Sequence, residues 1–168
     1  TSVYGHYEGA FAAMLFISDW EYTRDRAFAA NVTLPLLDGL NAFAHCYLHR
    51  SRDANGSLVL EDWNALVPDE ALENNPARNP ITGLSLMRRV AQAHKAIARA
   101  VGARYPAYVD EIISHLVPPP TGVAPTGQEV WVVGTGISPH NSTAHFFPSA
   151  MAFPLWPSES LEPLTMDA

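Results

Sequence analysis

The chain has 168 residues, of which 48% are hydrophobic and 16% are charged, and its formal net charge is −7. This balance is typical of a packed domain and argues against a disordered chain. An acidic chain with a single lysine offers no basic footprint for nucleic acid and is disfavoured on an anionic membrane surface. The one cysteine, Cys46, excludes an internal disulfide and a cysteine-rich zinc site.

The ends of the chain and its sequons bear on its origin. The most apolar run, residues 10–17, is shorter than the ~20 residues that cross a bilayer, so we expect no membrane partner. The chain begins at Thr1 without a signal peptide, and we expect it to be a piece of a longer protein. Sequons at Asn31, Asn55 and Asn141 would carry glycans in a secreted eukaryotic parent, and the compartment stays open.

The first half of the chain predicts a helical hairpin. Residues 8–22 are expected to be helical, because apolar residues recur there at helical spacing. Asp25 is the predicted N-cap of a second start, and Pro35 places the next helix near Leu34, since proline is tolerated only in a first turn. The predicted apolar face of the first helix consists of Phe11, Met14, Leu15, Ile17 and the ring of Trp20 or Tyr22, and the predicted buried face of the next helix consists of Leu36, Leu37, Leu40, Phe43, Ala44 and Tyr47.

The middle of the chain predicts a turn, a strand and the strongest helix. Residues 51–57 are rich in turn formers and precede a predicted strand at 58–60. Asn79 and Pro80 then open a helix that is expected to end at Gly102. Its predicted apolar stripe consists of Leu84, Met87, Val90, Ala91, His94, Ile97, Ala98 and Val101.

The last third predicts fewer regular elements. We expect a helix at 105–116, a proline-rich loop at 117–128 and a strand at 130–133. The predicted fold class is therefore mainly α. Residues 1–168 are expected to form one partial domain, with loops 51–79 and 117–147 inserted between helices.

Several motifs, taken in order, resemble helical-toroid glycosidases. Residues 22–28, YTRDRAF, resemble the YTGDRAF turn of these enzymes, and residues 34–43, LPLLDGLNAF, resemble the YPLLKGAAEFF helix that follows it. Residues 79–89 are similar to the NPxxxLALLRRLF helix of glycoside hydrolase family ninety-five. Residues 117–120 and 144–155 are similar to its LPPY and HLSHLYxLYP segments. The resemblance implies a fragment of an (α/α)₆ toroid from a family of inverting α-L-fucosidases and α-galactosidases.

The resemblance also implies a catalytic acid. Inverting glycosidases use two carboxyl groups, roughly 6.5–9.5 Å apart, as acid and base. In the family the acid is a glutamate in the loop before the Asn-Pro helix, and Glu73 matches that position. The acids of this loop are Glu61, Asp62, Asp69, Glu70 and Glu73, and the alternative is that they are simply solvated. No motif for the base precedes Ala168, so the isolated chain is expected to be inactive.

The expected partners are an oligosaccharide or glycan substrate and the remainder of the parent barrel. Trp63, Asn74 and Asn79 suit a sugar site, because amides bond hydroxyl groups and an indole packs on a sugar face. Helix capping is the alternative for Asn79. The resemblance adds His145, which matches a histidine of the family's pocket.

We expect no cofactor and no metal. His45 and His49 are four residues apart on a predicted helix, a metal-binding spacing, but no third ligand lies nearby in sequence. Two alternative functions stay open. One is a non-catalytic helical-toroid scaffold or carbohydrate-binding segment, and the other is a phosphorylase on the same toroid, which would need a basic phosphate pocket.

Overall fold

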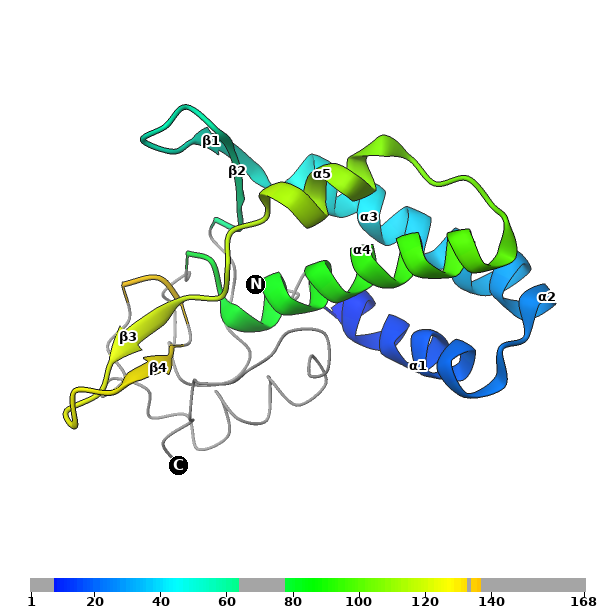
Figure 1. The fold of residues 1–168 in the computed structure, drawn as a ribbon, viewed down its shortest axis with the longest axis horizontal. Helices are drawn as coiled ribbons and strands as arrows, with labels where there is room; N and C mark the ends of the chain where they lie inside the picture. Colours follow the sequence, from blue (N-terminus) through cyan, green and yellow to red (C-terminus); the bar gives the residue numbers. More distant parts are fainter. Residues whose placement is uncertain (1–7, 64–77, 133, 137–168) are drawn as a thin grey trace, which may run out of the picture. The chain divides into compact units, whose positions relative to one another are not determined.

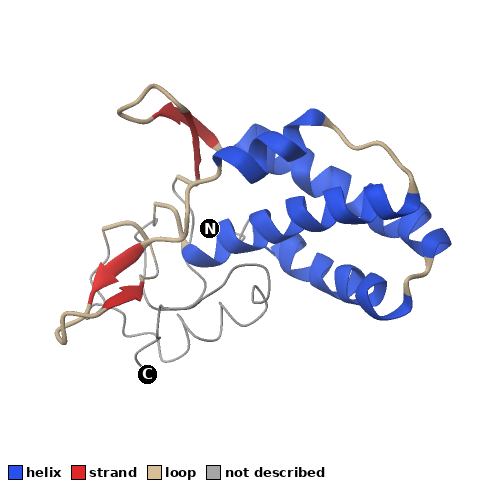
Figure 2. Ribbon diagram, in the orientation of Figure 1, coloured by secondary structure: helices blue, strands red, loops and turns tan. Residues whose placement is uncertain are grey.

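The computed structural model describes residues 8–63, 78–132 and 134–136. This part of the chain is mainly helical, as predicted, with two small two-stranded sheets (Figure 2). The chain divides into two compact units. The helical unit consists of residues 7–60 and 86–116, and the loop unit consists of residues 1–6, 61–85 and 117–168.

The first predicted helix is confirmed as α1 (Glu8–Thr23), but its predicted buried face is wrong in part. The residues that α1 buries are Ala10, Ala13, Ile17 and Trp20. Phe11 and Leu15 are exposed instead. Small residues on the buried side let α1 approach its neighbour closely, and a Cβ added to Gly9 would lie 3.0 Å from Leu40 Cδ2. Helical spacing identified the helix, but it did not decide which apolar stripe faces the core.

The next helical stretch is continuous, whereas the sequence predicted a restart near Leu34. It consists of α2 (Arg26–Phe28), the π-helical turn η1 (Ala29–Thr33) and α3 (Leu34–Tyr47). Asp25 Oδ1 accepts two backbone N–H groups of α2, which confirms its predicted role as N-cap. Pro35 lies in the first turn of α3 and has no N–H to donate. The wider turn immediately before it lets the helix continue without that hydrogen bond.

The buried face of α3 also differs from the prediction. The residues that it buries are Leu34, Leu37, Asn41 and Ala44, whereas Phe43 is exposed and stacks on Tyr47. Burial of Asn41 was not expected, because nothing in its local pattern distinguishes it from a surface amide.

Two hairpins contain the strands. β1 (His49–Arg52) pairs with β2 (Leu58–Glu61), which confirms the strand predicted at 58–60. β1 was not predicted, because its His-Arg-Ser-Arg sequence has no apolar residue. β3 (Thr121–Val123) pairs antiparallel with β4 (Glu129–Trp131). β4 confirms the second predicted strand, but β3 lies where the sequence predicted only a loop.

The strongest predicted helix is confirmed as α4 (Ile81–Val101). Val101, predicted to be buried, is only partly buried at the end of the helix. The predicted residues that α4 buries are Leu84, Met87, Val90, Ala91, His94, Ile97 and Ala98. Gly102, at a φ of +79°, ends the helix as expected, and the N–H of Ala103 donates to the carbonyl of Ala98. α5 (Ala107–His115) begins two residues later than predicted, directly after Pro106.

Within the helical unit α4 lies lengthwise between α1 and α5 (Figure 1). Arg89 of α4 pairs with Glu21 of α1, and Lys95 Nζ of α4 lies 2.6 Å from Asp110 Oδ1 of α5. Arg26 Nη1 donates to the carbonyl of Ala100 over 2.8 Å. These polar contacts surround an apolar core to which α1, α3, α4 and α5 all contribute.

One polar pair lies inside that core. Asn41 Nδ2 of α3 donates to the carbonyl of Leu37 and lies 3.2 Å from His94 Nδ1 of α4. Because this amide nitrogen is a donor, His94 must accept at Nδ1 and carry its proton on Nε2. The pair therefore needs the neutral imidazole, and the expectation that His94 is a core residue is confirmed.

We expect this pair to make stability pH-dependent. Burial lowers the pKa of His94 from 6.5, while the charge of Asp38 opposes that shift more weakly. Near pH 6.5, His94 of the unfolded state therefore binds a proton, whereas His94 of the folded state stays neutral. The contribution of this pair to stability is therefore complete above that pH. It is lost progressively as the pH falls from 6.5 toward the lowered folded pKa. Urea unfolding between pH 7.5 and 5.5 measures the slope, which His94→Gln should flatten; an unchanged slope would contradict this assignment.

Candidate functional site

A cluster of polar side chains in the loop unit joins the two ends of the segment 64–77. Glu61 ends β2 and Asp62 follows it, while Arg78 and Asn79 directly precede α4. We call these four residues the polar clamp. Glu61, Asp62 and Asn79 are buried, and Arg78 is half exposed. The clamp therefore lies at the base of the segment that carries the predicted acid.

Asp62 and Asn79 bond each other reciprocally. The backbone N–H of Asn79 donates to the carbonyl of Asp62 over 2.6 Å, and the backbone N–H of Asp62 donates to Asn79 Oδ1 over 2.9 Å. Asn79 has a φ of +54°, a left-handed conformation that asparagine tolerates better than most residues. These two bonds hold the chain on either side of the segment 64–77 side by side.

The carboxylate of Glu61 is the centre of the clamp. Its Oε1 accepts hydrogen bonds from Arg78 Nη2 at 2.6 Å and Nε at 3.2 Å, and from Asn79 Nδ2 at 3.3 Å. The Glu61 side chain is only 8% exposed. A carboxylate so buried is tolerated only with a paired cation and hydrogen bonds, and Arg78 and Asn79 supply both.

The glycine-rich segment that follows β4 also reaches the clamp. The N–H of Thr135 donates to the carbonyl of Arg78 over 2.8 Å, and Asn79 Nδ2 lies 3.3 Å from Thr135 Oγ1. Thr135 thus belongs to the same cluster.

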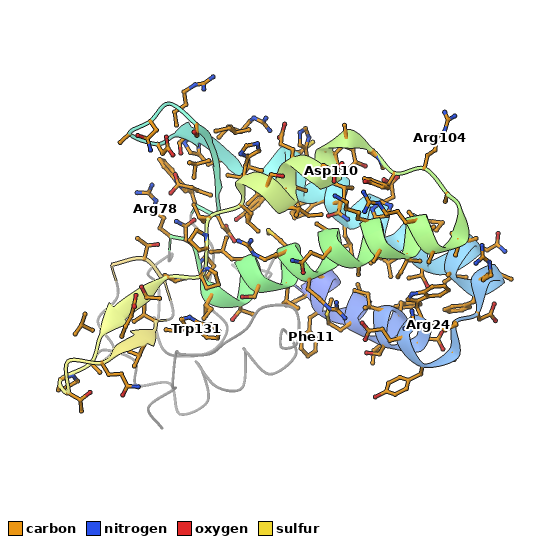
Figure 3. The ribbon with its side chains drawn as sticks, in the orientation of Figure 1. Phe11, Arg24, Arg78, Arg104, Asp110 and Trp131 are labelled. Atoms are coloured by element: carbon orange, nitrogen blue, oxygen red, sulfur yellow. The ribbon has the colours of Figure 1, made fainter. Side chains whose placement is uncertain are left out.

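Trp63 gives the site an exposed aromatic surface. The guanidinium of Arg78 lies 4.9 Å from the centroid of its ring, and Trp63 remains 41% exposed. Figure 3 labels Arg78, which leads into α4. Because Glu61 also accepts hydrogen bonds from this guanidinium, indole and guanidinium form one ordered surface. Such a surface offers an apolar face and hydrogen-bond donors, the combination that a sugar ring requires.

The structure brings together two of the predicted site residues, Trp63 and Asn79. The Asn79 side chain is buried, and its bonds to Asp62, Glu61 and Thr135 place it in the clamp. The other predicted residues, Glu73, Asn74 and His145, lie outside the described residues. The interpretation of the loop acids as solvated is wrong for Glu61 and Asp62. Arg78 was missed, and the only signal for it was its place directly before Asn79.

A second charged cluster, in the helical unit, uses one of the histidines considered as metal ligands. Glu111 Oε1 of α5 lies 2.6 Å from Arg50 Nη1 and 3.3 Å from His45 Nε2. The hydrogen bond from Arg50 lowers the pKa of Glu111 and keeps this carboxylate charged. Among the residues that the structure describes, no three His, Cys, Asp or Glu side chains are grouped closely enough to hold a metal ion.

A related contact joins α3 and α5 beside this cluster. The Tyr108 hydroxyl donates to Asp38 Oδ1 over 2.7 Å, and its ring stacks on His45. Burial, together with this bond, raises the pKa of Tyr108 to about 12. These contacts show that Tyr108, Asp38 and His45 connect α3 and α5. The polar clamp is therefore the stronger candidate site.

Comparisons with known proteins name no family. No protein-family model matches the chain, and no curated protein is significantly similar to it in sequence. Within the described parts of the chain, none of the helices combines the length and apolar character needed to cross a membrane.

Proposed function

We propose that this chain is part of the catalytic domain of an inverting glycoside hydrolase, built on an (α/α)₆ toroid and acting on an oligosaccharide or glycan. The ordered motif resemblance supports this proposal. The mainly helical fold agrees with it, because the segments that carry the YTRDRAF, LPLLDGLNAF and NPITGLSLMRR motifs lie in or beside helices of the expected order.

The observation that carries the proposal is the polar clamp with Trp63 beside it. Four residues hold together the base of the segment 64–77, which carries Glu73. An exposed indole stacked on a fixed guanidinium lies at the same base. Catalytic side chains are commonly carried by loops that a rigid scaffold positions. The clamp is a scaffold of that kind for Glu73.

The proposed mechanism divides the roles between this chain and the rest of the toroid. Glu73 protonates the glycosidic oxygen as the bond to the leaving group breaks. A carboxylate base from elsewhere in the longer protein removes a proton from the attacking water on the opposite face of the sugar. Trp63 packs against a sugar face. Glu61 is no substitute for Glu73, because its Oε1 is bonded to Arg78 and Asn79.

A carbohydrate-binding segment without catalysis is the second candidate. One specific observation favours it: the two carboxyl residues that directly precede Trp63 in the sequence, Glu61 and Asp62, are buried in the polar clamp. The phosphorylase alternative has less support. It needs cations available to phosphate, and the guanidinium next to Trp63 is paired with Glu61.

Both leading candidates require Trp63 to contact sugar, which gives a first test. We expect Trp63→Ala to weaken binding of fucosylated or galactosylated oligosaccharides by about tenfold, since loss of an aromatic contact costs about 1.4 kcal/mol. Isothermal titration calorimetry measures the change. Phe43→Ala, which removes another exposed aromatic ring, is the matched control and should bind normally. Unchanged binding by the Trp63 variant would remove this residue from the sugar site.

A further inference from the structure

An open cavity lies on the β1–β2 hairpin, which projects from the helices of the helical unit (Figure 1). Its volume is about 510 Å³, and it is lined by Arg50, Ser51 and Arg52 of β1 and Leu58 of β2. Arg50 and Arg52 are two residues apart in a strand, so their side chains leave the same face, with origins roughly 7 Å apart. None of the four lining residues is acidic, although the chain has 17 Asp and Glu against 10 Lys and Arg. The cavity therefore concentrates positive charge in an acidic chain.

Contacts within the helical unit hold both guanidiniums through Nη1. Arg50 Nη1 lies 2.6 Å from Glu111 Oε1 of α5, and the Arg50 side chain is still 44% exposed. Arg52 Nη1 donates to the carbonyl of Gly56, in the turn of the hairpin, over 2.5 Å. A guanidinium has five N–H donors. These contacts therefore orient each guanidinium and leave further N–H groups that a ligand can engage.

Arg52 brings a positive charge that no paired carboxylate offsets. Among the residues that the structure describes, it forms no ion pair. The acid next to it in sequence is Asp53, whose Oδ1 accepts the backbone N–H groups of Asn55 and Ser57 over 2.8 and 2.9 Å. That carboxylate is thus engaged in closing the turn. A negatively charged ligand in the cavity would offset the charge of Arg52.

We propose that this cavity binds a tetrahedral oxyanion group, phosphate or sulfate, between the guanidiniums of Arg50 and Arg52. A phosphate or sulfate ester presents three terminal oxygens, so two guanidiniums can donate to it at once, whereas one bidentate guanidinium occupies both oxygens of a carboxylate. The volume falls within the roughly 300–1,000 Å³ of small-molecule pockets, so a sugar-sized carrier of the group also fits, with Leu58 as an apolar wall. The site does not depend on the proposed glycosidase activity, and binding alone implies no phosphorolysis.

The first test is a titration of the whole chain followed by the amide resonances in NMR spectra. The probes are inorganic phosphate, inorganic sulfate, glucose 6-phosphate and glucose 6-sulfate, with glucose as the neutral control. We expect saturable shifts of amides within residues 49–58 for the anionic probes and none for glucose. If the two esters bind more tightly than the free ions, the group is carried by a larger molecule. If the free ions bind as tightly, the site takes the inorganic ion.

The second test separates a site from general attraction of anions to positive charge. We expect Arg52→Gln to raise the dissociation constant at least about tenfold, since hydrogen bonds between charged groups are lost. Arg52→Lys keeps the charge without the planar fork and should lie between the wild type and Arg52→Gln. Arg104→Gln, at an exposed arginine on the loop between α4 and α5 (Figure 3), removes the same charge and should change the constant less than about twofold. Circular dichroism establishes that all three variants keep their helices.

Three results would overturn the proposal. The first is the absence of saturable shifts in residues 49–58 with all four anionic probes. The second is an equal loss of affinity in Arg52→Gln and Arg104→Gln, because binding would then follow net charge. The third is binding of glucose as tight as that of its 6-phosphate and 6-sulfate, because the cavity would then recognise the sugar rather than the oxyanion.

Discussion

Glu73→Gln in the longer protein is expected to slow hydrolysis of a glycoside with a poor leaving group by about 10²–10⁴-fold, the usual contribution of general acid catalysis. A poor leaving group must be protonated as the glycosidic bond breaks, and the amide of glutamine is too weak an acid to transfer a proton. An aryl glycoside with an activated leaving group needs little protonation and should lose little rate. The measurement is kcat/KM for both substrates in the wild-type protein and in the variant.

The comparison between the two substrates separates catalysis from damage to the fold. Glu70→Gln is the matched control, because it makes the same change three residues away in the same loop. We expect it to leave both rates nearly unchanged. If Glu73→Gln reduces kcat/KM equally for both substrates, Glu73 is not the acid, and Glu70 or Asp69 becomes the next candidate. If none of these variants has an effect, the carbohydrate-binding alternative is favoured.

The helices were predictable because their signals are local. Asp25 and Gly102 mark helix ends through bonds and angles within a few residues, and the structure confirms both. The buried face of α1 was not predictable in the same way. Its apolar residues lie on two opposite sides, and only packing against the rest of the helical unit decides that Ala10 and Ala13 are buried while Phe11 and Leu15 are exposed. The local spacing of apolar residues determines that a helix forms, and tertiary contacts determine which of its faces is buried.

The candidate site was predictable only in part for a related reason. Trp63 and Asn79 were identified from their chemistry, one as an aromatic platform and one as an amide. The bonds of the polar clamp join residues 17 or 18 positions apart. No local sequence pattern predicts that Glu61 is buried or that Arg78 pairs with it. Asn79 was expected to bond sugar or cap a helix, and its actual partners become visible only when both ends of the segment 64–77 are brought together.

The second large effect is expected from Asn79→Ala. This variant removes the acceptor for the buried N–H of Asp62 and one donor to Glu61. An unsatisfied buried donor costs about 1–3 kcal/mol. Alanine at a φ of +54° costs about 1–2 kcal/mol more, since its Cβ crowds the backbone there. We therefore expect the free energy of unfolding to fall by about 3 kcal/mol, measured by urea denaturation.

Asn79→Gly separates the two contributions. Glycine adopts a positive φ without strain, so this variant loses the side-chain bonds but avoids the backbone cost. We expect it to be more stable than Asn79→Ala by about 1 kcal/mol and still less stable than the wild type. Asn31→Ala, at an exposed asparagine, should change stability by less than about 0.5 kcal/mol. Equal urea midpoints for Asn79→Ala and the wild type would mean that the clamp does not hold the base of the segment, and the mechanism proposed for Glu73 would lose its scaffold.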